Sequence, residues 1–276
     1  MENVVRTVYG NKLQTARLFG KPYVPDTNTT LNERFQVQSG AVLADGQYPT
    51  MAYLGIGNAG HTTVQGSNNM SYIKLYQHQP DDAACFGPMP WVLRHVTNDL
   101  SPSERSRYAM RVVQTFNGDN YYAYYLRRLD LSALVVKMQK KQIEDGVTTT
   151  TDFVPGPEVL VPTPSELANQ GTNVLQGNYL TASALLSLVL SANDCTELLN
   201  VASIIYSDEN HAIISEFALV TAADKQVGLS DGSNFLEAIC AQVATFLGSY
   251  HQIKFTRDGL TALLDVGASE ADSSTP

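Results

Sequence analysis

Alternating apolar and polar residues, many of them β-branched, mark a run of antiparallel strands over residues 108–153. Residues 108–116 and 121–129 flank the turn sequence Asn117-Gly118-Asp119-Asn120. Asn-Gly between two β-prone segments predicts a hairpin, because a type I′ turn needs positive φ at both central residues. Residues 134–143 and 147–154 predict a second hairpin around Glu144-Asp145-Gly146. The pattern therefore predicts an antiparallel meander.

Four tyrosines lie close together on the second of these strands, at Tyr121, Tyr122, Tyr124 and Tyr125. Successive residues of a strand point to opposite faces, so these rings cannot all form one flat stacking platform. Cross-strand aromatic packing is the favoured interpretation, and a carbohydrate- or base-binding surface is the alternative.

The periodicity changes after residue 178. Residues 183–190 form an apolar run that predicts a strand buried on both faces, and residues 212–220 predict another strand. Between them, Ser191 with Asp194 three residues later resembles a capping box at the start of a helix. The helix is predicted to rest on a sheet through the stripe Cys195, Leu198, Leu199, Ala202 and Ile205.

A second amphipathic helix is predicted to begin after Asn234. Its apolar positions recur at helical spacing, and they are Leu236, Ile239, Cys240, Val243, Phe246, Leu247 and Tyr250.

These elements predict an α+β protein with two domains. Prolines at 155, 157, 162 and 164, followed by glycines at 171 and 177, interrupt every pattern and indicate a boundary. We expect a β-rich meander domain over residues 1–155, a Pro/Gly linker over 156–178, a smaller α/β-sandwich-like domain over 179–267 with two helices on a sheet, and a disordered tail over 268–276. The first fifty residues read as an irregular arm, which packs either on neighbouring subunits or on its own domain.

Gly55, Gly57 and Gly60 spell G-x-G-x-x-G after a short apolar run, the pattern of a dinucleotide site. Such a site needs a helix N-terminus directly after the glycines, to bind the pyrophosphate. Residues 61–69 instead carry β-branched residues followed by a Gly/Ser/Asn turn cluster. We therefore expect no nucleotide site here. If Gly57 has positive φ, its replacement by valine is expected to disrupt the fold or assembly through a backbone clash.

Charge is scarce for a soluble chain: 16% of the 276 residues are charged and the formal net charge is −9. Short neutral polar side chains fill the gap, as suits a surface that loses water on assembly, although a Thr/Asn-rich β protein with ordinary loops explains the composition equally well. The acidic balance argues against nucleic-acid binding, which needs clustered Lys and Arg. The basic runs Arg127-Arg128 and 137–141 are short and are interpreted as solvated strand faces.

Candidate chemistry is sparse. Three cysteines without C-x-x-C spacing and five scattered histidines suggest neither a disulfide framework nor a metal site, and we expect no catalytic residue and no cofactor. Glu216 is the most unusual residue, an acid inside an apolar strand. If buried, it needs a partner such as an Arg or a cluster of backbone N–H groups, and a structural role is favoured over catalysis.

The N-terminus lacks the pattern of a signal peptide, and no segment approaches the ~18 apolar residues of a membrane span. We expect synthesis and folding in a reducing cytosol.

Several segments resemble a family of tailed-bacteriophage virion proteins of unassigned function. They spread over nearly the whole chain, at residues 7–14, 19–23, 28–33, 46–50, 56–61, 122–125, 207–216 and 254–256.

The resemblance implies a structural component of the virion, made in the host bacterial cytoplasm, with the tail baseplate favoured and the head–tail neck as the alternative. The implied partners are copies of itself in a symmetric ring and other tail proteins, without direct contact with nucleic acid or membrane. It implies no enzymatic activity. A carbohydrate- or nucleotide-binding module is the alternative from another class.

Overall fold

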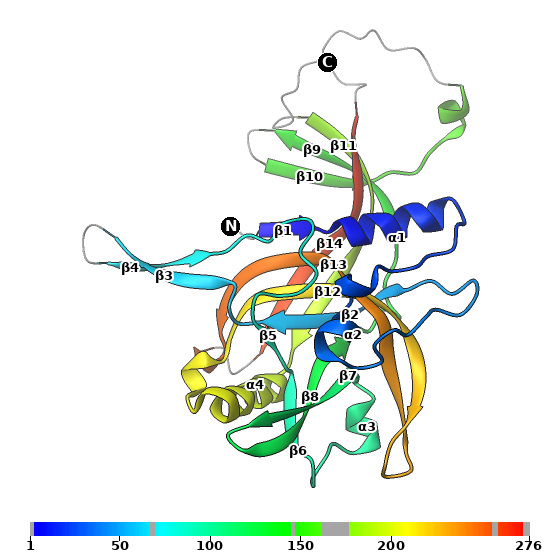
Figure 1. The fold of residues 1–276 in the computed structure, drawn as a ribbon. Coiled ribbons are helices and arrows are strands. Elements are labelled where there is room, and N and C mark those ends of the chain that lie inside the picture. Colours follow the sequence, from blue (N-terminus) through cyan, green and yellow to red (C-terminus); the bar gives the residue numbers. More distant parts are fainter. Residues whose placement is uncertain (1–2, 67–69, 145–146, 162–176, 256–258, 273–276) are drawn as a thin grey trace. The chain divides into compact units, whose positions relative to one another are not determined.

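The structure, a computed structural model, describes residues 3–66, 70–144, 147–161, 177–255 and 259–272 (Figure 1). The chain divides into two compact units, each of which draws on two stretches of sequence. Unit 1 comprises Met1–Asp130 and Leu190–Leu260, and unit 2 comprises Leu131–Val189 and Thr261–Pro276. Antiparallel strands dominate and helices are few, so the fold class is α+β, as predicted.

Unit 1 is built on one large antiparallel sheet. Its strands in the described part of the chain are β1 (Asn3–Arg6), β2 (Thr50–Gly57), β5 (Pro88–Met89), β6 (Val92–His95), β7 (Tyr108–Phe116), β8 (Asp119–Arg128), β12 (Ile213–Gly228) and β13 (Asn234–Gln252). The strand order is β1-β13-β12-β2-β8-β6, with β5 paired to β2 and β7 paired to β8. Late strands of the sequence therefore lie between early ones.

Short helices and a separate two-stranded hairpin complete unit 1. The helices are α1 (Val8–Leu18), α2 (Leu31–Phe35), α3 (Pro102–Arg105) and α4 (Ala192–Tyr206), and the hairpin consists of β3 (His61–Gln65) and β4 (Ser71–Leu75). Single 3₁₀ turns occupy Thr27–Thr29, Glu209–His211 and Ile253–Phe255. Across the described ranges, none of the helices has the length and apolar character that a bilayer crossing requires.

The first fifty residues are more regular than expected, and they pack on their own unit. β1 pairs with β13, with Asn3 opposite Gly248. The buried Thr7 hydroxyl donates to the Val243 carbonyl at 2.6 Å. The Asn32 amide binds the β13 backbone, donating to Ala238 O at 2.8 Å. Of the two sequence-based interpretations of the arm, packing on its own domain is the one observed.

The predicted Asn-Gly hairpin is confirmed. β7 and β8 pair from Tyr108 opposite Arg127 to Phe116 opposite Asp119. Asn117 and Gly118, between them, both have positive φ, at 51° and 92°. The tyrosines of β8 are used in packing: Tyr124 is buried and donates to Asp99 at 2.6 Å, and Tyr125 stacks on Phe35 with ring centroids 4.1 Å apart.

The first predicted helix of the C-terminal part is confirmed as α4, with the capping box between Ser191 and Asp194. Asp194 also accepts hydrogen bonds from Arg107 at 3.0 Å and from Arg127 at 2.9 Å. Arg127 was expected on a solvated strand face, and that expectation is wrong for its guanidinium, which pairs with the buried Asp194. The helix start is thus tied to β8.

The second predicted helix is wrong: its residues form β13, a strand of 19 residues. β13 lies between β1 and β12, and it is buried almost without interruption from Phe235 to Ser249. Burial on both faces removes the two-residue alternation that identifies a strand, so the apolar residues coincidentally matched helical spacing. Pairing with β12 along most of its length decides the conformation, as tertiary context overrides local pattern.

The predicted domain boundary also differs from the observed division. β12 and β13 complete the sheet of unit 1, so residues on both sides of the proline-rich segment belong to one unit. The predicted linker reaches into residues 162–176, which lie outside the described residues, while Pro157–Leu160 forms a 3₁₀ turn.

Unit 2 contains a four-stranded antiparallel sheet. Its strands are β9 (Lys137–Glu144), β10 (Val147–Asp152), β11 (Gly177–Leu190) and β14 (Leu260–Asp272), in the order β10-β9-β11-β14. The predicted pairing of β9 with β10 is confirmed. β11 is a strand as predicted, but its burial alternates, with Leu186 and Leu188 buried while Leu185 and Val189 are exposed, so the expectation of burial on both faces is wrong. The tail was expected to be disordered from residue 268, but residues 268–272 belong to β14, so the expectation is wrong for them. Residues 273–276 lie outside the described residues.

Candidate functional site

The glycine-rich segment connects two strands. β2 ends at Gly57 and the chain enters β3 at His61, so a strand follows the glycines where a dinucleotide site has a helix. The β-branched residues that follow Gly60 therefore lie in a strand, in agreement with the sequence pattern. Two of the three glycines instead adjoin a buried acid, Glu216 of β12.

Glu216 is buried, with 2% of its side chain exposed, and it lies opposite Gly57 in the pairing of β12 with β2. Its Oε2 atom accepts hydrogen bonds from the Phe86 backbone N–H at 2.8 Å and pairs with His78 Nε2 at 2.8 Å. The sequence predicted an Arg or backbone N–H groups as partners. The backbone donor is present, and the side-chain partner is a histidine.

His78 connects two carboxylates. Its Nδ1 lies 2.8 Å from Asp82 Oδ2, and its Nε2 lies 2.8 Å from Glu216 Oε2. The ring is stacked between Phe86 and Phe246, with centroid separations of 4.1 and 3.7 Å. These residues bring together the 76–88 segment, β12 and β13, and we call Asp82, His78 and Glu216 the histidine bridge.

Each short N···O contact of the histidine bridge needs one proton, carried either by the ring or by the facing carboxyl group. Glu216 Oε2 also accepts from the Phe86 N–H, and Asp82 Oδ2 also accepts from the Gln79 N–H. The bridge therefore satisfies both ring nitrogens of His78 inside unit 1.

Cys85 lies beside the bridge but is not arranged as a nucleophile. Burial, followed by the nearby Glu216 carboxylate, raises the pKa of the Cys85 thiol well above its usual value. A thiol attacks as its thiolate, which positive neighbours stabilise and a buried carboxylate does not. His78 and Glu216 are buried as well, and their contacts join separate segments of unit 1.

Gly57 and Gly60 make room for this cluster. A Cβ on Gly57 would lie 2.7 Å from Glu216 Oε1 and 2.9 Å from Cys85 Cβ, and a Cβ on Gly60 would overlap Glu216 Cγ. The sequence-based prediction for Gly57→Val assumed positive φ, which Gly57 does not have. The obstacles at Gly57 are the Glu216 and Cys85 side chains and the Gly87 carbonyl, and not a positive φ.

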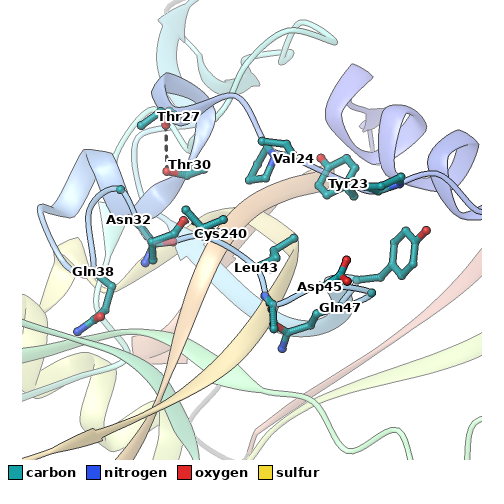
Figure 2. Close-up of a pocket in the computed structure, with 18 of the residues that line it drawn as sticks. Tyr23, Val24, Thr27, Thr30, Asn32, Gln38, Leu43, Asp45, Gln47 and Cys240 are labelled. Atoms are coloured by element: carbon teal, nitrogen blue, oxygen red, sulfur yellow. Dashed lines mark hydrogen bonds between the residues drawn. The ribbon is translucent and has the colours of Figure 1, made fainter.

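A second candidate site is a cavity of about 400 Å³ on unit 1 (Figure 2). It lies between the 20–30 segment and the 38–48 loop, with Cys240 of β13 among its lining residues. Its size is in the range of small-molecule sites.

The polar side chains of the cavity wall are largely engaged with the protein. Tyr23 Oη donates to Gln242 at 2.5 Å, Cys240 Sγ donates to the Ala41 carbonyl at 3.1 Å, and Glu33 Oε1 accepts from the Gly40 N–H at 2.8 Å. Burial raises the pKa of Tyr23 to about 12 and also raises that of Cys240. These contacts attach the N-terminal arm to β13. These polar groups of the cavity wall are thus already hydrogen-bonded within the protein.

The β3–β4 hairpin of unit 1 carries several exposed apolar side chains. Figure 1 shows it extending away from the large sheet. Met70 and Tyr72 are 68% and 55% exposed, and Ile73 and Tyr76 are exposed as well. Since Tyr72 and Ile73 are adjacent in a strand, apolar side chains are presented on both faces of the hairpin.

Sequence reasoning singled out Glu216 but did not connect His78 or Asp82 with it. His78 and Glu216 are 138 residues apart, so no spacing rule connects them. Within the described residues, no group of three His, Cys, Asp or Glu side chains is placed to bind a metal ion.

Comparison with known proteins gives one match. A profile described as a family of unknown function (DUF7208) matches residues 1–275. No curated protein and no solved structure matches the chain. Because the match covers nearly the full length, the chain belongs to the DUF7208 family.

Proposed function

We propose that this protein is a structural component of a tailed-bacteriophage virion, located in the tail baseplate, and that it acts by binding copies of itself and other virion proteins. The proposal joins the sequence resemblance to one structural observation, the exposed β3–β4 hairpin. The buried polar clusters of unit 1 serve its stability, which leaves surface contacts as the means of action.

The hairpin supports an assembly role because an isolated hairpin with exposed apolar side chains is unfavourable in water. A two-stranded hairpin is at best marginally stable in water, and this one exposes Tyr72 and Ile73 on opposite faces. Contiguous exposed apolar side chains mark interaction sites on soluble proteins. A neighbouring chain that covered the hairpin would bury these side chains and order the strands.

Composition agrees with this role. Few residues are charged, so a large surface can be desolvated at low cost when it meets a neighbour.

The test uses virions grown with a tagged copy of the full chain. We expect the chain to co-purify with intact particles at fixed stoichiometry. The double variant Tyr72→Ser, Ile73→Thr is expected to fold normally and to be at least tenfold depleted from particles. Val113→Thr, which changes an exposed apolar residue of β7, is the matched control and is expected to be incorporated normally.

Absence of the unmodified chain from purified particles would overturn the virion role. Normal incorporation of the double variant would overturn the role of the hairpin.

A further inference from the structure

We propose that the outer edge of β10 pairs with the same edge of a second copy of the chain, joining two unit 2 sheets across a twofold axis. This proposal rests on the assembly function and names one of its contacts. It concerns unit 2 only.

β10 is an open edge. It ends the sheet order β10-β9-β11-β14, so its outer backbone N–H and C=O groups have no strand partner among the described residues. All six residues, Val147–Asp152, are exposed. Their register with β9 is continuous from Val147 opposite Glu144 to Asp152 opposite Gln139. The edge is therefore continuous and exposed.

The usual protections of an edge strand are absent from β10. Natural proteins discourage edge pairing with Lys, Pro, bulges or very short strands. β10 has the sequence Val-Thr-Thr-Thr-Thr-Asp, without a Lys or Pro, and its pairing with β9 contains no bulge. Val and Thr are strongly β-prone. Such a strand is suited to accept another strand.

A second copy is the occupant that fits this edge best. In a twofold antiparallel pair one residue lies opposite itself, and the centre of β10 places Thr149 or Thr150 there. Threonines then face threonines, a favourable cross-strand pair. Asp152 is the single charged residue of β10, and with either centre it does not face its own counterpart.

The charges of the next strand do not oppose the pairing. Lys141 of β9 lies opposite Thr150, so two copies of Lys141 would be separated by three strand spacings, roughly 14 Å. That distance exceeds the Debye length of about 8 Å at physiological ionic strength. In addition, Lys141 is paired with Asp265.

The test is disulfide trapping of the full-length chain at high protein concentration. The single variants Thr149→Cys and Thr150→Cys are oxidised mildly and resolved on a non-reducing gel. We expect at least one of them to give tenfold more covalent dimer than Leu185→Cys, an exposed position on the inner strand β11 of the same sheet. Adding Thr148→Lys and Thr151→Lys to the trapping variant is expected to abolish the dimer.

Dimer yields no higher than that of Leu185→Cys for both variants would overturn the edge pairing, and so would a dimer that survives the two lysines. Particle incorporation is scored separately. Normal incorporation without trapped dimer would overturn the edge pairing and leave the proposed function standing. Trapped dimer without incorporation would support the edge pairing and overturn the proposed function.

Discussion

Glu216 lies directly opposite Gly57 in the pairing of β12 with β2, and a Cβ on Gly57 would lie 2.7 Å from its Oε1 atom. A segment that imitates a nucleotide-binding loop is thereby explained by packing. Positions 57 and 60 require glycine because the buried Glu216 side chain occupies the space that a larger side chain would fill. Gly55 has no such neighbour, since its Cβ would meet Ala218 at an ordinary 3.6 Å.

The three glycines are therefore expected to respond differently to alanine. Gly57→Ala and Gly60→Ala should lower the free energy of unfolding by about 2 kcal/mol, as overpacked cores do. Gly55→Ala, the control, should change it by less than about 0.5 kcal/mol. Urea denaturation followed by circular dichroism measures all three. Equal effects at the three positions would contradict the packing explanation.

The histidine bridge is expected to behave as a coupled pair. Glu216→Gln alone should cost about 3 kcal/mol, because it removes the buried carboxylate that His78 Nε2 and the Phe86 N–H contact. His78→Gln should also be destabilising, and the double variant should be more stable than the sum of the two single losses predicts, by at least ~1 kcal/mol. Chemical denaturation of the four proteins gives this coupling energy. Strict additivity would mean that the two residues do not interact.

Glu237 predicts a pH dependence. Burial raises the pKa of this carboxyl, whose Oε1 accepts the Arg111 N–H at 3.4 Å. A raised folded-state pKa means that the folded state binds the proton more tightly. The stability that this tighter proton binding contributes is complete below the unfolded-state pKa of about 4.3. It is lost as the pH rises through the folded-state pKa.

Glu237→Gln removes that titration. We expect the variant to be at least as stable as the original protein at neutral pH, with the advantage shrinking as the pH falls towards 4. Thermal unfolding across this range provides the measurement. A variant that loses stability mainly at neutral pH would show that the ionised carboxylate is favourable where it lies.

The cysteines are expected to be unreactive in the folded protein. Cys85, Cys195 and Cys240 are buried and not in disulfides, and burial raises the pKa of each thiol. Reaction with a thiol reagent near neutral pH should be at least about a hundredfold slower than after denaturation. The absorbance of the coloured thiolate released from the reagent measures the reaction. Denatured protein should react at three thiols. Rapid labelling of one thiol in the native protein would place that residue at the surface.

Local signals predicted local structure. The Asn117-Gly118 turn and the Ser191 to Asp194 capping box depend on neighbouring residues only, and both appear as expected. Glu216 was identified because an acid in an apolar strand must have partners. Its backbone donor followed from that requirement.

Long-range pairing could not be predicted in the same way. β13 matched helical spacing because almost every residue from Phe235 to Ser249 is buried, and its strand conformation depends on β1 and β12. His78 reaches Glu216 from a segment that carries no motif. The division into units also depends on pairing, since β12 inserts beside β2 from the far side of the proline-rich segment.

The position of β12 and β13 between early strands sets the order of events during synthesis. β2 finds its partner about 160 residues later, and Asn3 pairs with Gly248. The ribosome must therefore release most of the polypeptide before the large sheet can close. Such non-local topology slows folding and leaves strand edges unpaired on the nascent chain. We expect productive folding to depend on chaperones that shield the N-terminal half while translation finishes.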